Sequence, residues 1–70
     1  MTDPTRDDVR QALTVADIAS DLARATHRTA EAGTISARAE AANMRTAAGM
    51  LLDAAEVLTA WAHVLDGGEA

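Results

Sequence analysis

The sequence lacks several residue types on which common protein chemistries depend. It contains no Cys, no Lys, no Phe and no Tyr, and Trp61 is its only aromatic residue. Without Cys there are no disulfides, thiolate metal sites or thiol nucleophiles. Its only serines are Ser20 and Ser36, and it has neither a Gly-x-Ser-x-Gly motif nor a glycine-rich phosphate loop. We therefore expect a non-enzymatic protein with no catalytic residues, no metal and no cofactor.

The charge balance also restricts the classes of partner. The net charge is −5 at pH 7, and binding to nucleic acid or to anionic membranes requires a positive field. The sequence begins without a basic region followed by an apolar run, as a secretory signal would require. The longest apolar stretch, residues 50–65, includes Asp53, Glu56 and His63 and is shorter than the roughly 20 apolar residues of a membrane span. We expect a cytoplasmic protein without membrane association.

Length and alanine content together indicate a small helical protein. Seventy residues suffice for one domain, here 1–70, and a single core of that size is marginal without a disulfide or a metal. Roughly a quarter of the residues are Ala, the strongest helix former. The combination of Arg without Lys and abundant Ala is typical of a GC-rich genome, such as that of an actinobacterium or one of its phages. The composition predicts an all-α fold, with oligomerisation as the remaining way to complete the core.

Capping residues and glycines predict two helices joined by a short hinge. The first helix is expected over about 4–32 and the second over about 36–66, with a hinge at 33–36 and a frayed tail at 67–70. Gly33 is suited to a left-handed C-cap. The candidate caps are Ser, Thr and Asp residues near the two helix starts, namely Thr2, Asp3, Thr5, Thr34 and Ser36. Asp66, Gly67 and Gly68 are expected to end the second helix. Helices of equal length with a short connection form an antiparallel hairpin.

Gly49 stands in the interior of the second predicted helix. Gly in such a position costs about 1 kcal/mol relative to Ala. We therefore expect another backbone to approach the helix closely at Gly49.

The second predicted helix has a heptad repeat. Its large apolar residues recur seven apart, and alanines at 41, 48, 55 and 62 precede them by three. This pattern predicts left-handed coiled-coil geometry with close, Ala-rich packing. The first helix carries an apolar stripe of its own. We assign the seam within the hairpin to Val15, Ile18, Leu22, Met44, Leu51, Leu58 and Leu65.

Further apolar residues of the second helix lie well over 90° around it from the leucines, at 100° per residue. A single partner helix does not cover both sides. We therefore expect a homodimeric four-helix bundle whose interface contains Asn43, Met50, Val57, Trp61 and Val64. Asn43 is a candidate for a polar residue that sets register. The alternative dimer seam is the alanine face of the first helix, formed by Ala12, Ala16, Ala19 and Ala23.

The alternation of large residues and Ala resembles that of the Rop-type RNA-binding hairpin dimers. The resemblance covers the architecture of the two helices and carries no RNA-contacting residues over to this sequence. The arginines near the hinge, Arg24, Arg28, Arg38 and Arg45, could separately form a basic patch, and the alternative function is a Rop-like RNA-binding dimer that uses this end. The absence of Lys and of aromatic residues for base stacking argues against it. The WXG100 proteins are also Ala-rich acidic hairpins, but this sequence has EAGTIS in place of their Trp-x-Gly turn and is shorter.

Two histidines are the remaining candidates for site chemistry. His27 and Glu31 are spaced i, i+4 on one helix face, which is compatible with metal ligation, and His63 is near the other end of the hairpin. No Glu-x-x-His pair typical of di-iron bundles is present. We expect His27 and Glu31 to form a local surface pair.

These observations favour a small protein–protein interaction module that acts as a dimeric helical bundle. A regulator, an inhibitor, an antitoxin or a phage-encoded host-takeover factor would each fit. The alternatives are the Rop-like RNA-binding dimer and an obligate subunit of a heteromeric helical complex, in which a different chain replaces the second copy.

Overall fold

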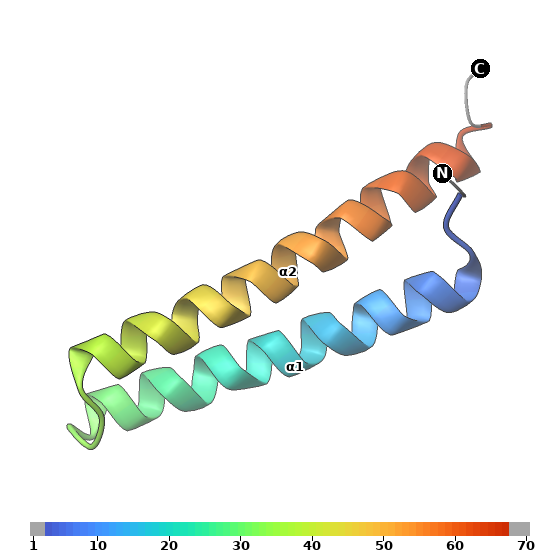
Figure 1. Ribbon diagram of the computed structural model, residues 1–70. Coiled ribbons are helices and arrows are strands. Elements are labelled where there is room, and N and C mark those ends of the chain that lie inside the picture. The colour runs from blue at the N-terminus through green and yellow to red at the C-terminus, as the bar shows by residue number, and fades with distance from the viewer. Residues whose placement is uncertain (1–2, 68–70) are drawn as a thin grey trace.

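The computed structural model describes residues 3–67, which form two antiparallel α-helices joined by a short turn (Figure 1). Helix α1 spans Arg6–Glu31 and helix α2 spans Ala37–Leu65. The hairpin is long and narrow, with principal extents of 51 × 17 × 16 Å. The predicted all-α hairpin is confirmed.

Both helices begin at capping residues that the sequence offers. Thr5 and Asp8 form a reciprocal capping box, in which the Asp8 N–H donates to Thr5 Oγ1 and the Thr5 N–H donates to Asp8 Oδ2. Ser36 caps α2, and its Oγ accepts a hydrogen bond from the Ala39 N–H at 3.1 Å. Of the other candidate caps, Asp3 and Thr34 do not take this role, and Thr2 lies outside the described residues.

The turn after α1 is a Schellman motif centred on Gly33. Gly33 has a φ of 75°, in the left-handed region that favours glycine. Its N–H donates to the Ala30 carbonyl, and the Thr34 N–H donates to the Thr29 carbonyl at 3.1 Å. Helix α2 ends similarly at Asp66, where Gly67 has a φ of 98°. Gly68 and the remainder of the predicted tail, 68–70, lie outside the described residues.

The two helices meet through small side chains. The buried residues recur seven apart along each helix, and Ala19 is fully buried. Within residues 3–67 no large side chain is fully buried. A seam of this kind allows two helix backbones to approach closely, because alanine adds little thickness between them. Its members are Ala12, Ala19, Thr26, Ala47 and Ala54.

The residues predicted for the seam on α2 lie along one edge of the buried alanines. Leu51, Leu58 and Leu65 are exposed, with Leu51 at 41% and Leu58 at 36%. The residues predicted for a contact between chains lie nearer the alanine row or along its other edge, where Met50, Val57, Trp61 and Val64 are half-buried and Asn43 is exposed. The physical reason is that the alanine row determines which side of α2 comes closest to α1, and the leucine row lies to one side of it.

On α1 the predicted seam is partly correct. Val15 and Leu22 are half-buried beside the alanine seam, as is Met44 of α2. Ile18 is 53% exposed, because it lies about 100° around α1 from Ala19, which faces α2.

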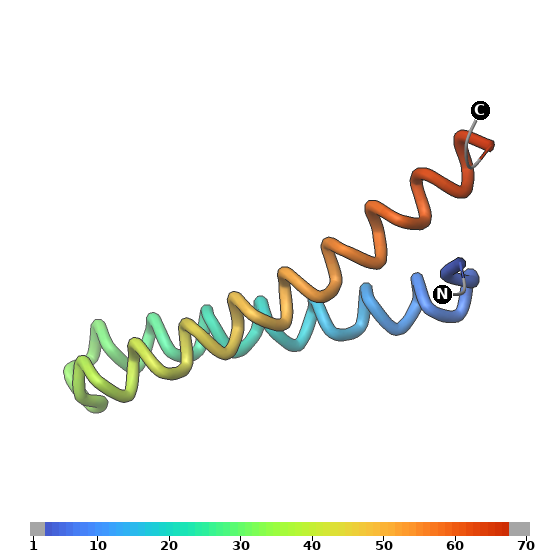
Figure 2. The backbone as a smooth tube through the Cα atoms, turned by 45° about the horizontal axis from the view of Figure 1, so that its top comes forward, coloured from blue at the N-terminus to red at the C-terminus, as the bar shows by residue number. Residues whose placement is uncertain are grey.

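The helices separate toward the open end of the hairpin, where the termini lie (Figures 1 and 2). They lie close together along the hinge half and diverge beyond the middle of α2. At the open end the Arg6 guanidinium lies 5.0 Å from the centre of the Trp61 ring, a cation–π contact that links the two helices. Leu65 lies at the end of α2, where the helices have diverged, and its side chain is largely exposed.

Replacing the interior Gly49 and the turn Gly33 by Ala should change the stability of the hairpin in opposite directions. A methyl group at Gly49 meets nothing within 4 Å, so no close backbone approach within the hairpin explains this residue. Gly49→Ala should raise the free energy of unfolding by about 1 kcal/mol. Gly33→Ala meets no neighbour either, but its positive φ should make it destabilising by about 1–2 kcal/mol. Thermal melts followed by circular dichroism would measure both, and a destabilising Gly49→Ala would contradict the open environment.

Candidate protein interaction surface

Two shallow depressions identify the two long faces of the hairpin. The first is lined by Ala23, Arg24, His27 and Arg28 of α1 together with Met44 of α2. Residues seven apart lie on the same side of a helix, so Leu51, Leu58 and Leu65 share the side of Met44, and Leu13 shares the side of His27. We call this side the leucine face, defined by Leu13, Met44, Leu51, Leu58 and Leu65.

The opposite face has fewer exposed large apolar side chains, and its depression is lined by several polar residues. Its depression lies between the helices and is bordered by charged and amide side chains as well as by Val15 and Val57. Ile18 belongs to this face, because it lies seven residues from Gln11, which lines the depression. The polar residues around the depression are Asp8, Gln11, Asp53 and Glu56.

The leucine face is where the exposed apolar surface is concentrated. Six large hydrophobic residues are exposed within residues 3–67, and Leu13, Leu51, Leu58 and Leu65 of these are on the leucine face. Leu52, 67% exposed, lies at its edge, where it lines a further depression on the outer side of α2 with Ala55, Thr59 and Ala62. Contiguous exposed apolar surface of this kind marks sites of protein or membrane contact.

Leu13 and Leu52 are exposed residues that the sequence pattern does not predict as candidate site residues. Leu13 shares its heptad row with Ser20 and His27, which are polar, and Leu52 shares its row with Arg45 and Thr59. Neither row is an apolar stripe, so periodicity gives no signal for these two residues. Their exposure follows from the position of the alanine seam.

A single polar contact between the helices is described, between Asn43 and Thr26. Asn43 Nδ2 donates to Thr26 Oγ1 at 3.3 Å, and Thr26 is the buried polar residue of the described chain. A hydrogen bond at this position favours one register of α1 against α2, since a slipped register would leave the Thr26 hydroxyl buried without this partner. Asn43 therefore faces α1, and a register-setting role for it within the hairpin remains a prediction.

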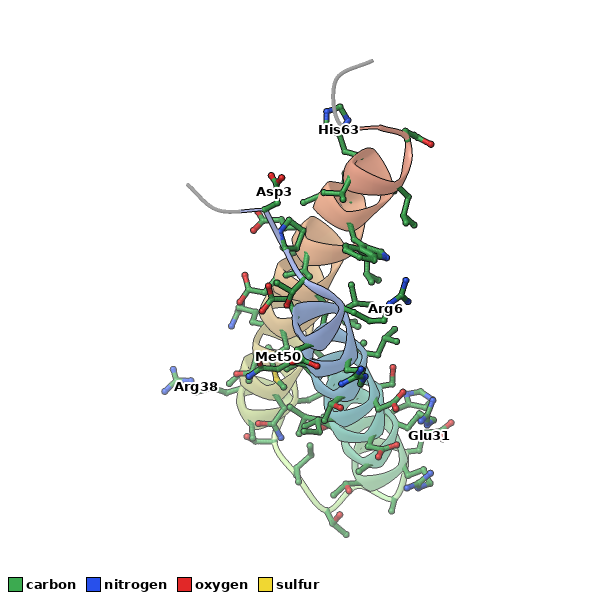
Figure 3. The ribbon with its side chains drawn as sticks, turned by 90° about the vertical axis from the view of Figure 1, so that its right-hand side faces the viewer. Asp3, Arg6, Glu31, Arg38, Met50 and His63 are labelled. Carbon is green, nitrogen blue, oxygen red and sulfur yellow. The ribbon has the colours of Figure 1, made fainter. Side chains whose placement is uncertain are left out.

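The four arginines of the predicted RNA-binding patch are divided between two sides of the hairpin. A step of two residues corresponds to about 200° around a helix. Arg24 and Arg28 are each two residues from Thr26. Arg45 is two residues from Asn43. Because Thr26 and Asn43 face each other, Arg24 and Arg28 lie on the outer side of α1 and Arg45 on the outer side of α2. Figure 3 shows Arg38 projecting on the side of the hairpin away from Glu31.

The ion pairs described are local and exposed. Arg24 Nη2 lies 2.8 Å from Asp21 Oδ1, and His27 Nε2 lies 3.4 Å from Glu31 Oε1. Exposed pairs of this kind contribute roughly 0–1 kcal/mol each. Within residues 3–67 no group of three or more His, Asp or Glu side chains is placed to hold a metal ion.

Helix α2 is also long and apolar enough to cross a membrane when judged by length and composition alone. A single helix of this kind is weak evidence, because helices of soluble bundles pass the same test. Arg45, Asp53 and Glu56 lie in its middle part, and a charged side chain at the centre of a bilayer costs at least about 2.5–3.5 kcal/mol.

Comparison with known proteins found no matching family model, no similar curated protein and no similar solved structure.

The Asn43–Thr26 contact gives a testable prediction about the hairpin itself. Asn43→Ala should lower the free energy of unfolding by about 1 kcal/mol, and Thr26→Val should have little further effect once Asn43 is removed. A double-mutant cycle by urea denaturation should therefore give a coupling energy of about 0.5–1.5 kcal/mol. Thr46→Val on the exposed side of α2 is the control, because the Thr46 hydroxyl bonds only the Ala42 carbonyl of its own helix. Additive effects would show that the contact does not set the register.

Proposed function

We propose that this hairpin is a non-enzymatic protein-binding module that acts as a homodimer, with the leucine face as its contact surface. The observation that supports this is the placement of the large apolar side chains: five of the six exposed ones lie on the leucine face or at its edge. Interfaces are distinguished by a core depleted in charge, and α2 has no charged residue on this face between Met44 and Leu65.

The size of the hairpin's own core supports assembly. Complete burial of a Leu side chain contributes about 1.5–3 kcal/mol, whereas an alanine methyl contributes much less. The described core consists of four alanines and one threonine, so the large apolar side chains of an isolated hairpin are at most partly buried. A second hairpin over the leucine face would bury Leu51 and Leu58 and complete a four-helix bundle.

This interface differs from the one that the sequence predicted. Most of the residues predicted for the contact between chains are half-buried beside α1, and the more exposed apolar face is that of Leu51 and Leu58. The biological roles compatible with such a module are those of a regulator, an inhibitor, an antitoxin or a host-takeover factor. In each role an apolar helix face packs against a helix or groove of the target.

The proposal predicts different effects on dimerisation for the same substitution at two exposed apolar residues of α1. Leu13 on the leucine face and Ile18 on the opposite face are 50% and 53% exposed. Leu13→Glu should abolish the dimer at micromolar concentration, because it places a charge in an apolar contact. Ile18→Glu, with the same change in net charge, should leave the dimer intact. Light scattering should give twice the chain mass of 7.3 kDa for the native protein and for Ile18→Glu.

The same experiment separates the alternatives. A native protein that is monomeric and well folded would contradict the homodimer and favour a heteromeric complex. If Ile18→Glu dissociates the dimer and Leu13→Glu does not, the contact lies on the opposite face. RNA binding would appear as a gel shift at physiological salt that weakens steeply with added salt and is lost when Arg24, Arg28, Arg38 and Arg45 are neutralised.

A further inference from the structure

The charge-free surface of α2 is a continuous strip along the leucine face. It combines the leucine row with the alanine row that lies beside it, and no Asp, Glu, Arg or His interrupts it from Ala41 to Leu65. Most of these residues are exposed in the hairpin. The strip consists of Ala41, Met44, Ala48, Leu51, Ala55, Leu58, Ala62 and Leu65. On α1 the leucine face is interrupted by Ser20 and His27, so the strongest apolar contact available is that of α2 with another α2.

The charged residues on the outer side of α2 are sorted by sign along the helix. Glu56 borders both the depression with Leu52, Ala55 and Ala62 and the depression of the opposite face. Arg45 stands two residues after Asn43, and Glu56 stands two residues after Ala54; since Asn43 and Ala54 face α1, both charges lie on the outer side of α2. Arg38, seven residues before Arg45, adds a second positive charge in the hinge half. Asp66, at the end of the helix, adds a second negative charge in the open half. His63 lies on the same side as Glu56.

We infer that the leucine face is occupied by a second copy of this chain, with α2 packed antiparallel to the partner's α2 across a two-fold axis near Leu51. This inference rests on the proposed function, because it specifies the geometry of the proposed homodimer.

The charge order favours the antiparallel arrangement. In a symmetric parallel pair every residue lies level with its own copy, so Arg45 would face the second Arg45 and Glu56 the second Glu56. In the antiparallel pair Arg45 and Glu56 come to nearly the same level, because they lie six residues before and five residues after Leu51, about 9 Å and 7.5 Å along the axis. Two Arg45–Glu56 pairs would then lie on the outer side of the pair of α2 helices, where opposite charges attract.

The antiparallel arrangement also places large side chains of one strip opposite large side chains of the other, and alanines opposite alanines. With the axis near Leu51, Leu51 lies opposite its own copy, Met44 lies opposite Leu58 of the second chain, and Ala48 lies opposite Ala55. The alanines permit close approach of the two α2 helices, as Ala47 and Ala54 do toward α1. His63 lies level with Arg38 in this arrangement and contributes no attraction, so the Arg45–Glu56 pairs are the ones that determine orientation.

The absence of native Cys makes disulfide cross-linking a direct test. Leu51→Cys should form a disulfide-linked dimer on mild oxidation. Leu58→Cys alone should not, because its two copies would be about 21 Å apart along the axis, well beyond the roughly 7 Å limit between Cα atoms. A mixture of Ala48→Cys and Ala55→Cys should give the mixed dimer and serves as a second test with small substitutions. Ile18→Cys on the opposite face is the control and should not cross-link.

The outcomes test the antiparallel pairing of the α2 helices separately from the proposed homodimer. Self-linking of Leu58→Cys as fast as Leu51→Cys would show a parallel pair and overturn the inference. A dimer by light scattering without any of the expected cross-links would place α2 against the partner's α1, which also overturns the inference but leaves the proposed dimer intact. A monomer by light scattering would overturn the proposed function itself.

Charge reversal tests the orientation independently. Glu56→Arg should raise the dimer dissociation constant roughly 3- to 10-fold at low salt, since it creates two like-charge contacts with Arg45. Adding Arg45→Glu should restore the dissociation constant to within about twofold. Asp53→Arg on the opposite face makes the same change in net charge and should leave the dissociation constant unchanged. Failure of the double reversal to restore dimerisation in sedimentation equilibrium would overturn the antiparallel pairing.

Discussion

The contact between small residues on the facing sides of α1 and α2 determines how every other side chain of this hairpin is placed. Ala19, Ala47 and Ala54 are almost completely buried, and helices that meet through alanine come close enough for their backbones to limit the space between them. Larger side chains are then excluded from the centre of the seam and lie along its two edges. Leu51 and Leu58 lie along one edge and Val57 along the other, which separates the apolar residues into two faces.

The ends of the helices could be predicted from the sequence because local chemistry determines them. Thr5 and Ser36 cap the two helices, and Gly33 takes the left-handed conformation that the turn requires. Each of these depends on residues within a few positions in the chain, so tertiary structure does not override it. The antiparallel arrangement follows from the short turn between two helices of similar length.

The assignment of the helix faces could not be predicted in the same way. Two rows of α2, one with Leu51 and Leu58 and the other with Met50 and Val57, are both apolar and both repeat every seven residues. Assigning the largest side chains to the seam within the chain assumes that bulk decides which side packs. Here the choice depends on Ala47 and Ala54, whose small side chains contribute little to any hydrophobic pattern. Hydrophobic periodicity alone therefore does not determine which of the two apolar rows of α2 is the more exposed.

The stability of this fold and its assembly are coupled for a physical reason. An isolated hairpin must offset the conformational entropy of ordering about 60 residues, at roughly 1–2 kcal/mol each for the backbone alone, with a seam composed of alanines and one threonine. Burial of Leu51, Leu58 and Leu13 against a second surface adds apolar contacts without ordering any more backbone. A ligand that binds only the folded form stabilises it in proportion to the logarithm of its concentration. In the proposed homodimer a second copy would act as such a ligand, so the helicity of this chain should depend on protein concentration. The surface that binds the second copy would then also complete the fold.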